Sequence, residues 1–363
     1  MRTFAIFTII VLVAVIRGQD DDGVLKCAGG YCVAKALCPN GTYIGNAEFA
    51  QQQNIIAVRI DDYDDCTDYL LTCCKTPASE IDEDSEIDFE EPPASEKFGE
   101  VCGISNEKGL VYTLHSNETV AQYGEFPWVA YISIINGTTS STTFVCGGTL
   151  IHPLLVLTAA HSVDENSNYT VRFGEWDIGT DKEPYPHKDI IVSEIIKHPA
   201  YKLLPIQNDI AVLYLEEAVV YKTHIQPICL PQPTDSFDGL RCISNGWGTV
   251  EGTYATIMKK ISLPVIPRAR CERMLQFAGL GPFYRLPQGF MCAGGEANVD
   301  MCKGDGGSPL ACKQTNGSFV LAGIVSWGIG CGGQNLPGAY VSVSNFVPWI
   351  NEQIYKANHL VIY

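Results

Sequence analysis

Positive charge is scarce in this 363-residue chain, in which 24 Lys and Arg residues face 41 Asp and Glu residues, for a formal net charge of −17 at pH 7. A surface this negative repels phosphate backbones, so we exclude nucleic acid as a partner. Long apolar runs are lacking too. The N-terminal run from Phe4 to Ile16 has thirteen residues, whereas a helix that spans a membrane needs about 20. We therefore expect no membrane span.

This short apolar run instead predicts a signal peptide. It follows Met1 and Arg2 and is closed by Arg17 and Gly18, which is the order of charged, apolar and small residues in a secretory leader. We assign residues 1–18 to the signal peptide and expect a secreted, extracellular protein. Five Asn-x-Ser/Thr triplets are candidates for glycosylation in such a chain. They begin at Asn40, Asn117, Asn136, Asn168 and Asn316.

Cysteine is plentiful, and the fifteen cysteines form two groups. Six lie within residues 27–74, a segment with too few large apolar side chains to build a core, so disulfides must hold it together. Six cysteines allow fifteen pairings, and spacing alone does not choose among them. The odd total leaves at least one thiol without a partner in the chain.

An acidic linker follows over residues 76–101. It carries ten Asp and Glu residues against one basic residue, Lys97, and it includes Pro92 and Pro93. The stretch shows no helical or strand period, as is typical of an unpacked segment. We favour an exposed linker without a binding role over a binding segment. Because its backbone is open to a protease, Lys97 is the candidate cleavage site.

The chain from Cys102 onward is mainly β in pattern. Short runs rich in β-branched and aromatic residues alternate with Gly, Pro and Asn clusters, which predicts an all-β barrel or sandwich. These runs are Trp128–Ile135, Val156–Leu157, Ile210–Leu215 and Leu321–Ser326. Residues 347–355 carry apolar side chains at helical spacing and form the one helix that the sequence predicts with clarity.

Three segments of this region carry a chemical signature. They are Leu157-Thr158-Ala159-Ala160-His161, Asn208-Asp209-Ile210-Ala211-Val212-Leu213 and Cys302-Lys303-Gly304-Asp305-Gly306-Gly307-Ser308-Pro309. In sequence and order they resemble the chymotrypsin-like serine proteases over about residues 124–357. The resemblance implies a double β-barrel with a C-terminal helix. It also implies that His161 matches the general base, Asp209 the carboxylate that orients it, and Gly306 the serine nucleophile.

Glycine at the nucleophile position excludes the family's reaction. Without a hydroxyl at position 306, no oxygen attacks the scissile carbonyl and no acyl-enzyme forms. Ser308 lies two residues away, but a shift of several ångströms takes a hydroxyl out of reach of the base. We expect Ser308 to replace a glycine, and we interpret His161 and Asp209 as an inactive pair.

The same resemblance places a specificity pocket and a calcium loop. Asp300 matches the base of a trypsin-like pocket, and Gly328 and Gly338 match its walls. A slot that binds an Arg or Lys side chain without cleaving the chain is therefore an alternative to a pocket with no ligand. Glu175 matches a ligand of the family's calcium loop, so calcium is a candidate ion, although the sequence establishes no cofactor.

A second departure concerns activation. In the family, cleavage exposes a terminal ammonium that pairs with the aspartate matching Asp305. Counting back from Glu125-Phe126-Pro127-Trp128 puts that terminus at His115, after Leu114, where no basic residue marks a cleavage site. We therefore expect Asp305 to lack its usual partner and Gly306→Ser alone to restore no competent protease.

Family spacing further implies four disulfides and one unpaired cysteine. The pairs are Cys102–Cys229, Cys242–Cys312, Cys271–Cys292 and Cys302–Cys331. This leaves Cys146, because Ser162 occupies the position of its usual partner. We favour a buried, inert thiol at Cys146 over a reactive or intermolecular one.

The N-terminal module resembles the arthropod clip domains. Its cysteines are separated by four, five, twenty-seven, six and zero residues and end in adjacent Cys73 and Cys74, ahead of a linker and Cys102. The resemblance implies a clip domain over residues 19–75 and a protease-like domain over 102–363. The pairing it implies is Cys27–Cys73, Cys32–Cys66 and Cys38–Cys74.

Together the two modules resemble the serine protease homologues, the non-catalytic branch of the clip-domain proteins. What this implies is a haemolymph cofactor of innate immunity that acts with prophenoloxidase and its clip-domain activating proteases in melanisation, and that is itself cleaved. A homo-oligomer after cleavage is a further expectation. Two alternatives stay open: a microbe-binding recognition or adhesion protein, and a cryptic trypsin-like protease.

Overall fold

Two compact units make up the chain. The computed structural model describes residues 26–27, 30–34, 56–58, 71–74, 101–114, 119–137, 141–180, 183–250 and 253–360. One unit comprises residues 1–52 and 60–86, and the other comprises 53–59 and 87–363. The expected signal peptide and residues 76–100 of the expected linker, which include Lys97, lie outside the described residues.

The first unit contains a small antiparallel sheet. Its strands β1 (Lys26–Cys27), β2 (Gly30–Ala34) and β4 (Leu71–Cys74) are ordered β1-β2-β4. Cys32 lies opposite Cys73 in the register of β2 and β4. The three disulfides expected in this module involve side chains outside the described part of the chain. In the second unit, β3 (Ile56–Val58) pairs in parallel with β5 (Tyr112–Leu114).

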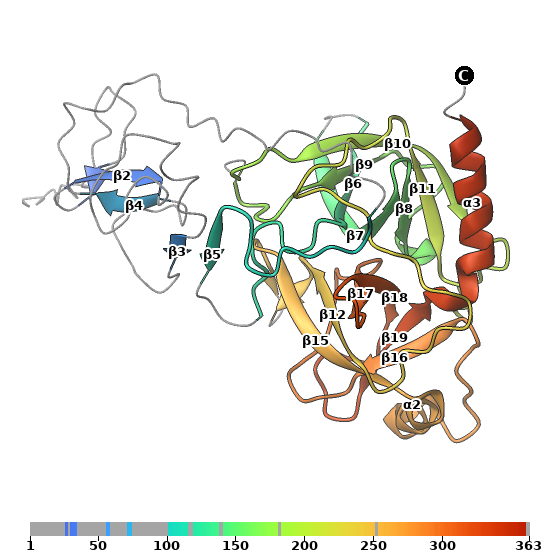
Figure 1. Cartoon of the computed structure of the whole chain (residues 1–363). Helices are drawn as coiled ribbons and strands as arrows, with labels where there is room; N and C mark the ends of the chain where they lie inside the picture. The colour runs from blue at the N-terminus through green and yellow to red at the C-terminus, as the bar shows by residue number, and fades with distance from the viewer. Residues whose placement is uncertain are drawn as a thin grey trace, which may run out of the picture. The chain divides into compact units, whose positions relative to one another are not determined.

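A closed barrel forms the first half of the second unit. Its strands are β6 (Val129–Ile135), β7 (Thr142–His152), β8 (Leu155–Thr158), β9 (Tyr169–Phe173), β10 (Lys188–Lys197) and β11 (Ala211–Leu215). They are ordered β10-β11-β8-β7-β6-β9, and β9 pairs with β10 to close the ring (Figure 1). Every other residue of β9 is buried, as expected for a strand with one face on a core. All residues of β8 and β11 are buried.

A second closed barrel follows. Its strands are β12 (Arg241–Gly246), β15 (Lys259–Ile266), β16 (Phe290–Gly294), β17 (Pro309–Lys313), β18 (Phe319–Trp327) and β19 (Pro337–Ser342). They are ordered β12-β15-β16-β19-β18-β17, with β12 pairing with β17 to close the ring. A short hairpin, β13 (Thr249–Val250) and β14 (Thr253–Tyr254), lies between β12 and β15. Each barrel has its own apolar core, and the expected mainly β fold with two barrels is confirmed.

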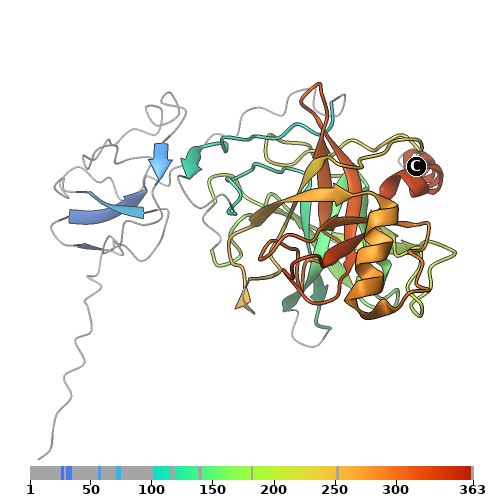
Figure 2. The same cartoon turned by 90° about the horizontal axis from the view of Figure 1, so that it is seen from below.

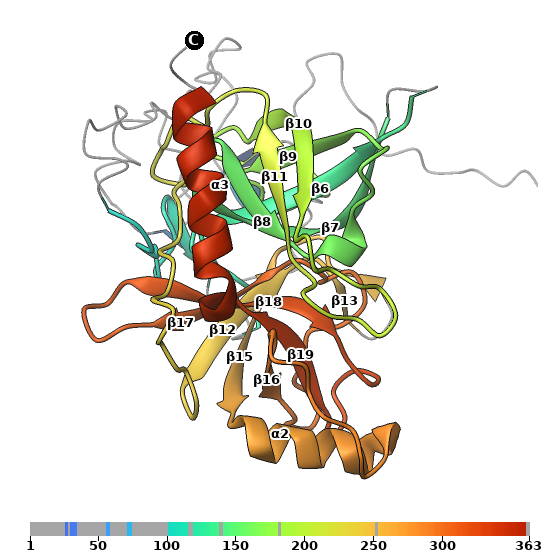
Figure 3. The ribbon, with the colours of Figure 1, turned by 90° about the vertical axis from the view of Figure 1, so that its right-hand side faces the viewer.

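Helices are few and lie outside the barrels. The expected C-terminal helix is α3 (Val347–Leu360), which continues past residue 355. Figure 3 shows α3 running beside β11, where the Tyr214 hydroxyl donates to the Gln353 carbonyl at 3.1 Å. Shorter helical turns are η4 (Ala160–Ser162), η5 (Gln276–Leu280) and η6 (Val343–Phe346).

One helix was not predicted. It is α2 (Arg268–Leu275), which begins after Pro267 and packs on β16 (Figure 2, orange). Within it only Cys271 and Leu275 are buried. Two inward residues over eight give too weak a period to separate from a loop in the sequence.

Four disulfides join the pairs that family spacing implies. They are Cys102–Cys229, Cys242–Cys312, Cys271–Cys292 and Cys302–Cys331. Cys146 is buried and free among the described cysteines, and burial raises the pKa of its thiol to about 12. Three of the five glycosylation candidates, Asn136, Asn168 and Asn316, are exposed. Asn40 and Asn117 lie outside the described residues. No helix in the described part of the chain is long and apolar enough to cross a bilayer.

We predict that Cys146 resists alkylation in the folded protein. At pH 8 a thiol with a pKa near 12 is almost wholly protonated, and the thiolate is the reactive form. Peptide mapping should find Cys146 unmodified after iodoacetamide treatment of the native protein and modified after treatment in guanidinium chloride without reductant. Rapid native labelling, or a disulfide at Cys146, would contradict the prediction.

Candidate functional site

Two members of the expected triad form a hydrogen-bonded pair. His161 lies in η4, directly after β8, and Asp209 lies just before β11. β8 and β11 pair antiparallel, with Thr158 opposite Ala211. The end of β8 therefore lies beside the start of β11, and this brings His161 close to Asp209. His161 Nδ1 lies 2.7 Å from Asp209 Oδ2, and the His161 main-chain N–H donates to Asp209 Oδ1 at 2.8 Å. The Ser326 hydroxyl also donates to this fully buried carboxylate.

Gly306 faces this pair from the second barrel. It lies in the loop before β17, and its carbonyl accepts a hydrogen bond of 2.9 Å from the Gly147 N–H of the first barrel. A Cβ atom built on Gly306 would lie 3.3 Å from His161 Nε2. A side chain at this position would therefore meet the base, but glycine supplies no hydroxyl to attack a carbonyl.

The hydroxyl that lies next to the imidazole of His161 belongs to Ser162. Ser162 Oγ lies 3.2 Å from His161 Nε2 and 3.1 Å from the Cβ position built on Gly306. Ser162 belongs to η4 and not to the loop of Gly306, so it satisfies the free nitrogen of the imidazole without restoring the loop nucleophile. The sequence identified Ser162 only as a lost disulfide partner, and this contact was missed.

Ser308 is enclosed elsewhere between the barrels. Its side chain is buried, and its hydroxyl has no hydrogen-bond partner among the described residues. Cβ atoms built on Gly147 and Gly246 would lie 2.1 and 2.8 Å from Ser308 Oγ. The two glycines thus make room for the Ser308 hydroxyl, which fills space between main-chain segments and is not hydrogen-bonded to His161.

A cavity of about 400 Å³ lies beside His161 and Gly306. Its lining includes Asp300, Gly328 and Gly338, the three residues predicted for the pocket. A Cβ atom built on Gly338 would lie 3.6 Å from Asp300 Oδ1. Glycine at position 338 therefore keeps the space next to the carboxylate free of a side chain, whereas a Cβ atom built on Gly328 would lie 3.6 Å from the Gly330 carbonyl oxygen.

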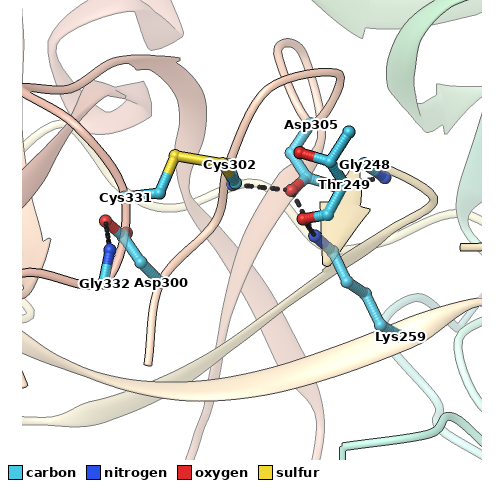
Figure 4. The surroundings of a disulfide bond; sticks show 8 residues. All are labelled: Gly248, Thr249, Lys259, Asp300, Cys302, Asp305, Cys331 and Gly332. Atoms are coloured by element: carbon cyan, nitrogen blue, oxygen red, sulfur yellow. Dashed lines mark hydrogen bonds and ion pairs between the residues drawn. A yellow bond between two sulfur atoms is a disulfide. The ribbon is translucent and has the colours of Figure 1, made fainter. Parts of the chain in front are cut away.

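Asp300 is short of hydrogen-bond donors. Its Oδ2 accepts a hydrogen bond of 3.1 Å from the Gly332 N–H (Figure 4), whereas its buried Oδ1 has no partner in the described part of the chain. Burial raises the pKa of Asp300 to about 6, and the N–H groups of Gly332 and Met301 oppose the shift. A guanidinium or ammonium group would supply the missing donor and a compensating charge, so the pocket fits a basic side chain.

Asp305, next to Gly306, has a cationic partner inside the barrel. Lys259 Nζ lies 2.6 Å from Asp305 Oδ2, and both side chains are buried (Figure 4). Residues 115–118, where the expected terminus would begin, lie outside the described residues. The expectation that Asp305 lacks its usual partner, a terminal ammonium, stays a prediction, and the Lys259 side chain provides the carboxylate with a cation.

The expected calcium loop brings two buried carboxylates together. Glu175 Oε1 accepts from the Trp176 N–H at 2.9 Å, and Arg172 Nη1 lies 3.1 Å from Glu175 Oε2. Burial, a hydrogen bond with Glu175 and the charge of Glu175 raise the pKa of Glu183 to about 9. Two carboxylates in contact need a shared proton or a cation, and oxygen ligands suit calcium. We propose that Glu175 and Glu183 supply two of the ligands of a calcium site; the described residues hold no group of three His, Cys, Asp or Glu side chains that could bind a metal ion, and residues 181–182 of the loop lie outside the described part.

Comparison with known proteins supports the same assignment as the geometry. A family model described as Trypsin matches residues 116–350, which contain His161, Asp209, Gly306 and the pocket. The chain belongs to the trypsin family.

Within the trypsin family, the chain resembles proteins named as inactive. The inactive CLIP domain-containing serine protease A28 of Anopheles gambiae is 56% identical over 98% of this chain and 96% of its own length. The inactive CLIP domain-containing serine protease A8 of the same organism is 47% identical over 93% of this chain and 92% of its own length. Phenoloxidase-activating factor 2 of Galleria mellonella is 39% identical over 72% of this chain and 92% of its own length. The chain is therefore a non-catalytic clip-domain serine protease homologue.

We predict that p-aminobenzamidine binds the pocket with an affinity that rises with pH. The ionised Asp300 carboxylate attracts the amidinium, and with a pKa near 6 its ionised fraction grows about tenfold between pH 5 and 7. Fluorescence titration should show this increase, and Asp300→Asn should weaken binding about 10- to 100-fold at pH 7.

The matched control for that titration is His161→Ala. Histidine side chains also change charge in this pH range, and His161 lines the same pocket. His161→Ala should bind the amidine with the same pH dependence as the wild type. Binding that is independent of pH, or that survives Asp300→Asn, would contradict the role of Asp300.

We predict that Glu183→Gln stabilises the calcium-free protein at pH 8. A carboxyl whose folded pKa is raised to about 9 contributes stability at low pH that is lost as pH rises above its unfolded value of 4.5. Glutamine keeps the hydrogen bond and does not ionise, so Tm in EGTA should rise by about 5 °C at pH 8. The gain should shrink at pH 5.

With calcium, the wild type should have a higher Tm than Glu183→Gln, the reverse of the order expected in EGTA. Calcium should raise the Tm of the wild type and leave that of Glu183→Gln unchanged, because the variant lacks one anionic ligand. An equal calcium shift in both proteins would exclude Glu183 as a ligand.

Proposed function

We propose that the protein is a secreted, non-catalytic cofactor of a haemolymph proteolytic cascade, and that this cascade activates prophenoloxidase. The observation that carries the proposal is glycine at position 306 beside a retained His161–Asp209 pair and a pocket with Asp300 in its lining. Hydrolysis is lost with the nucleophile, whereas recognition of a basic side chain depends on Asp300 and the cavity, which are separate groups.

The chemistry of the pocket suits a protein that holds a partner without cutting it. Proteases of this cascade cleave after basic residues if they share the trypsin-like pocket, and prophenoloxidase would present such a residue at its activation site. A pocket with a buried, unpaired carboxylate oxygen would bind the same residue. The complex would persist because no acyl transfer follows binding.

The relatives support the pathway. One is named phenoloxidase-activating factor 2, and another, phenoloxidase-activating factor 1 of Holotrichia diomphalia, is 34% identical over 78% of this chain. We therefore propose prophenoloxidase and its clip-domain activating proteases as the partners, and haemolymph as the location. Secretion rests on the N-terminal apolar run of residues 4–16.

Processing after Lys97 forms part of the proposal. Cys102 is bonded to Cys229, so every residue from 102 onward stays attached to the barrels. A cut after Lys97 lies before Cys102 and would leave no covalent link between the clip module and the barrels, provided that its six cysteines pair among themselves. The pairing of β3 with β5 would then be the contact that still holds residues 56–58 to the second unit. Assembly of the cleaved protein into a homo-oligomer is a further part of the proposal, taken from the resemblance to the serine protease homologues.

We predict that the processed protein increases prophenoloxidase activation several-fold. Purified prophenoloxidase is incubated with its activating protease, with or without this protein and with or without calcium, and phenoloxidase activity is measured. Asp300→Asn should lower the increase at least severalfold, because it removes the charge that binds the basic residue.

His161→Ala is the control for catalysis in this assay. It should retain the full increase, since the cofactor transfers no proton to or from a substrate. Loss of the effect in His161→Ala, or labelling of the wild type by a fluorophosphonate, would favour a cryptic enzyme. If the wild-type protein does not increase phenoloxidase activity, the proposed role in prophenoloxidase activation is wrong.

A further inference from the structure

A buried ion pair lies behind the pocket. Lys259 is the first residue of β15, and its Nζ lies 2.6 Å from Oδ2 of Asp305. The side chains are 6% and 0% exposed. The partner of the carboxylate is therefore a residue in the middle of the chain, whose charge is present whether or not the backbone is cut elsewhere.

The Asp305 carboxylate is fully engaged. Its Oδ1 accepts the Gly248 N–H at 2.8 Å, and its Oδ2 accepts the Cys302 N–H at 2.8 Å in addition to the Lys259 ammonium. A Cβ atom built on Gly248 would lie 2.3 Å from Asp305 Cγ, so the surrounding main chain is in close contact. A second ammonium would have to enter this closely packed space beside Lys259.

The ammonium is needed for the charge of Asp305. Burial raises the pKa of Asp305 above its ordinary value, while Lys259 and the N–H groups of Cys302 and Gly248 oppose the shift. Without Lys259, a buried carboxylate would keep only two main-chain donors. Removing one partner of such a pair is strongly destabilising, because the other charge remains buried and uncompensated.

Covalent and hydrogen bonds connect this pair to the pocket. The Cys302 N–H binds Asp305, the Cys302 side chain is bonded to Cys331, and the neighbouring Gly332 N–H holds Asp300 (Figure 4). Cys302, Cys331 and Asp300 all line the cavity. The ion pair thus fixes the segment that carries the floor of the pocket.

We propose that Lys259 makes the pocket a constitutive binding site for a guanidinium or ammonium side chain, formed in the uncut chain and unchanged by cleavage in the linker. The inference rests on the proposed function, because it concerns the same pocket. It also removes the ground for expecting Gly306→Ser alone to fail, since that expectation required Asp305 to have no counter-ion. Cleavage then acts on the clip module and not on the pocket.

The first test uses the wild-type chain alone. The affinity for p-aminobenzamidine is measured by fluorescence at pH 7.5 for the full-length secreted protein, before and after cleavage at Lys97. Equal affinity in the two forms is expected. Binding only after cleavage would overturn the inference and leave the proposed function intact. No binding in either form would overturn the pocket function itself.

The second test compares two neighbouring lysines. Lys259→Met removes the buried ammonium, whereas Lys260→Met removes one that pairs with Glu125 at 2.8 Å, away from the pocket floor. Lys259→Met should weaken binding at least about tenfold, because the competent fraction of the pocket falls and the apparent Kd rises in proportion. Its Tm should fall by about 10 °C. Lys260→Met should bind as the wild type does.

Hydrogen exchange separates a disordered pocket from an unfolded domain. In Lys259→Met, exchange should accelerate in residues 300–306 and 328–332 and stay slow in β6–β9 of the first barrel. If Lys259→Met binds the amidine as tightly as the wild type, Lys259 does not form the pocket. If the variant is unfolded throughout, the comparison of cut and uncut wild type still decides the inference.

Discussion

A carboxylate buried behind the pocket is the constraint on which the second barrel depends. Asp305 cannot leave its place, because it is held between the main chain of Gly248 and that of Cys302. Nor can it stay ionised there without a nearby cation, since the ionised form loses its hydration on burial. Lys259 in β15 provides this cation. The loop that carries Gly306, and the disulfide that borders the pocket, are ordered around this one pair.

Glycine at position 306 therefore removes the nucleophile without changing the surrounding structure. Removing a hydroxyl at position 306 leaves the contact between the barrels intact, because the carbonyl of Gly306 still accepts from Gly147. His161 keeps Asp209 on one nitrogen and gains Ser162 on the other. Every polar group of the pair is satisfied without a substrate or a nucleophile. A site of this kind is stable as a binding surface, and nothing in it requires turnover.

Sequence reasoning found the residues that lie within motifs and missed those that depend on register. His161, Asp209, Gly306 and Asp300 are each flanked by residues typical of the family. Lys259 stands beside Lys260 with no such motif. Side chains alternate along a strand, so one of two adjacent lysines in a buried strand must face inward. That signal was available, but choosing between the two required the pairing of β15 with β12.

The position of cleavage follows from the same electrostatics. Where a new terminus must supply the cation for a buried aspartate, the cut has to fall at a fixed distance along the chain from the barrel. Lys259 removes this requirement, because its ammonium reaches Asp305 without any cut. The absence of a basic residue at Leu114 is then of no consequence to the pocket. A cut is free to lie in the acidic linker, because Cys102 and Cys229 close their bridge on the barrel side of Lys97.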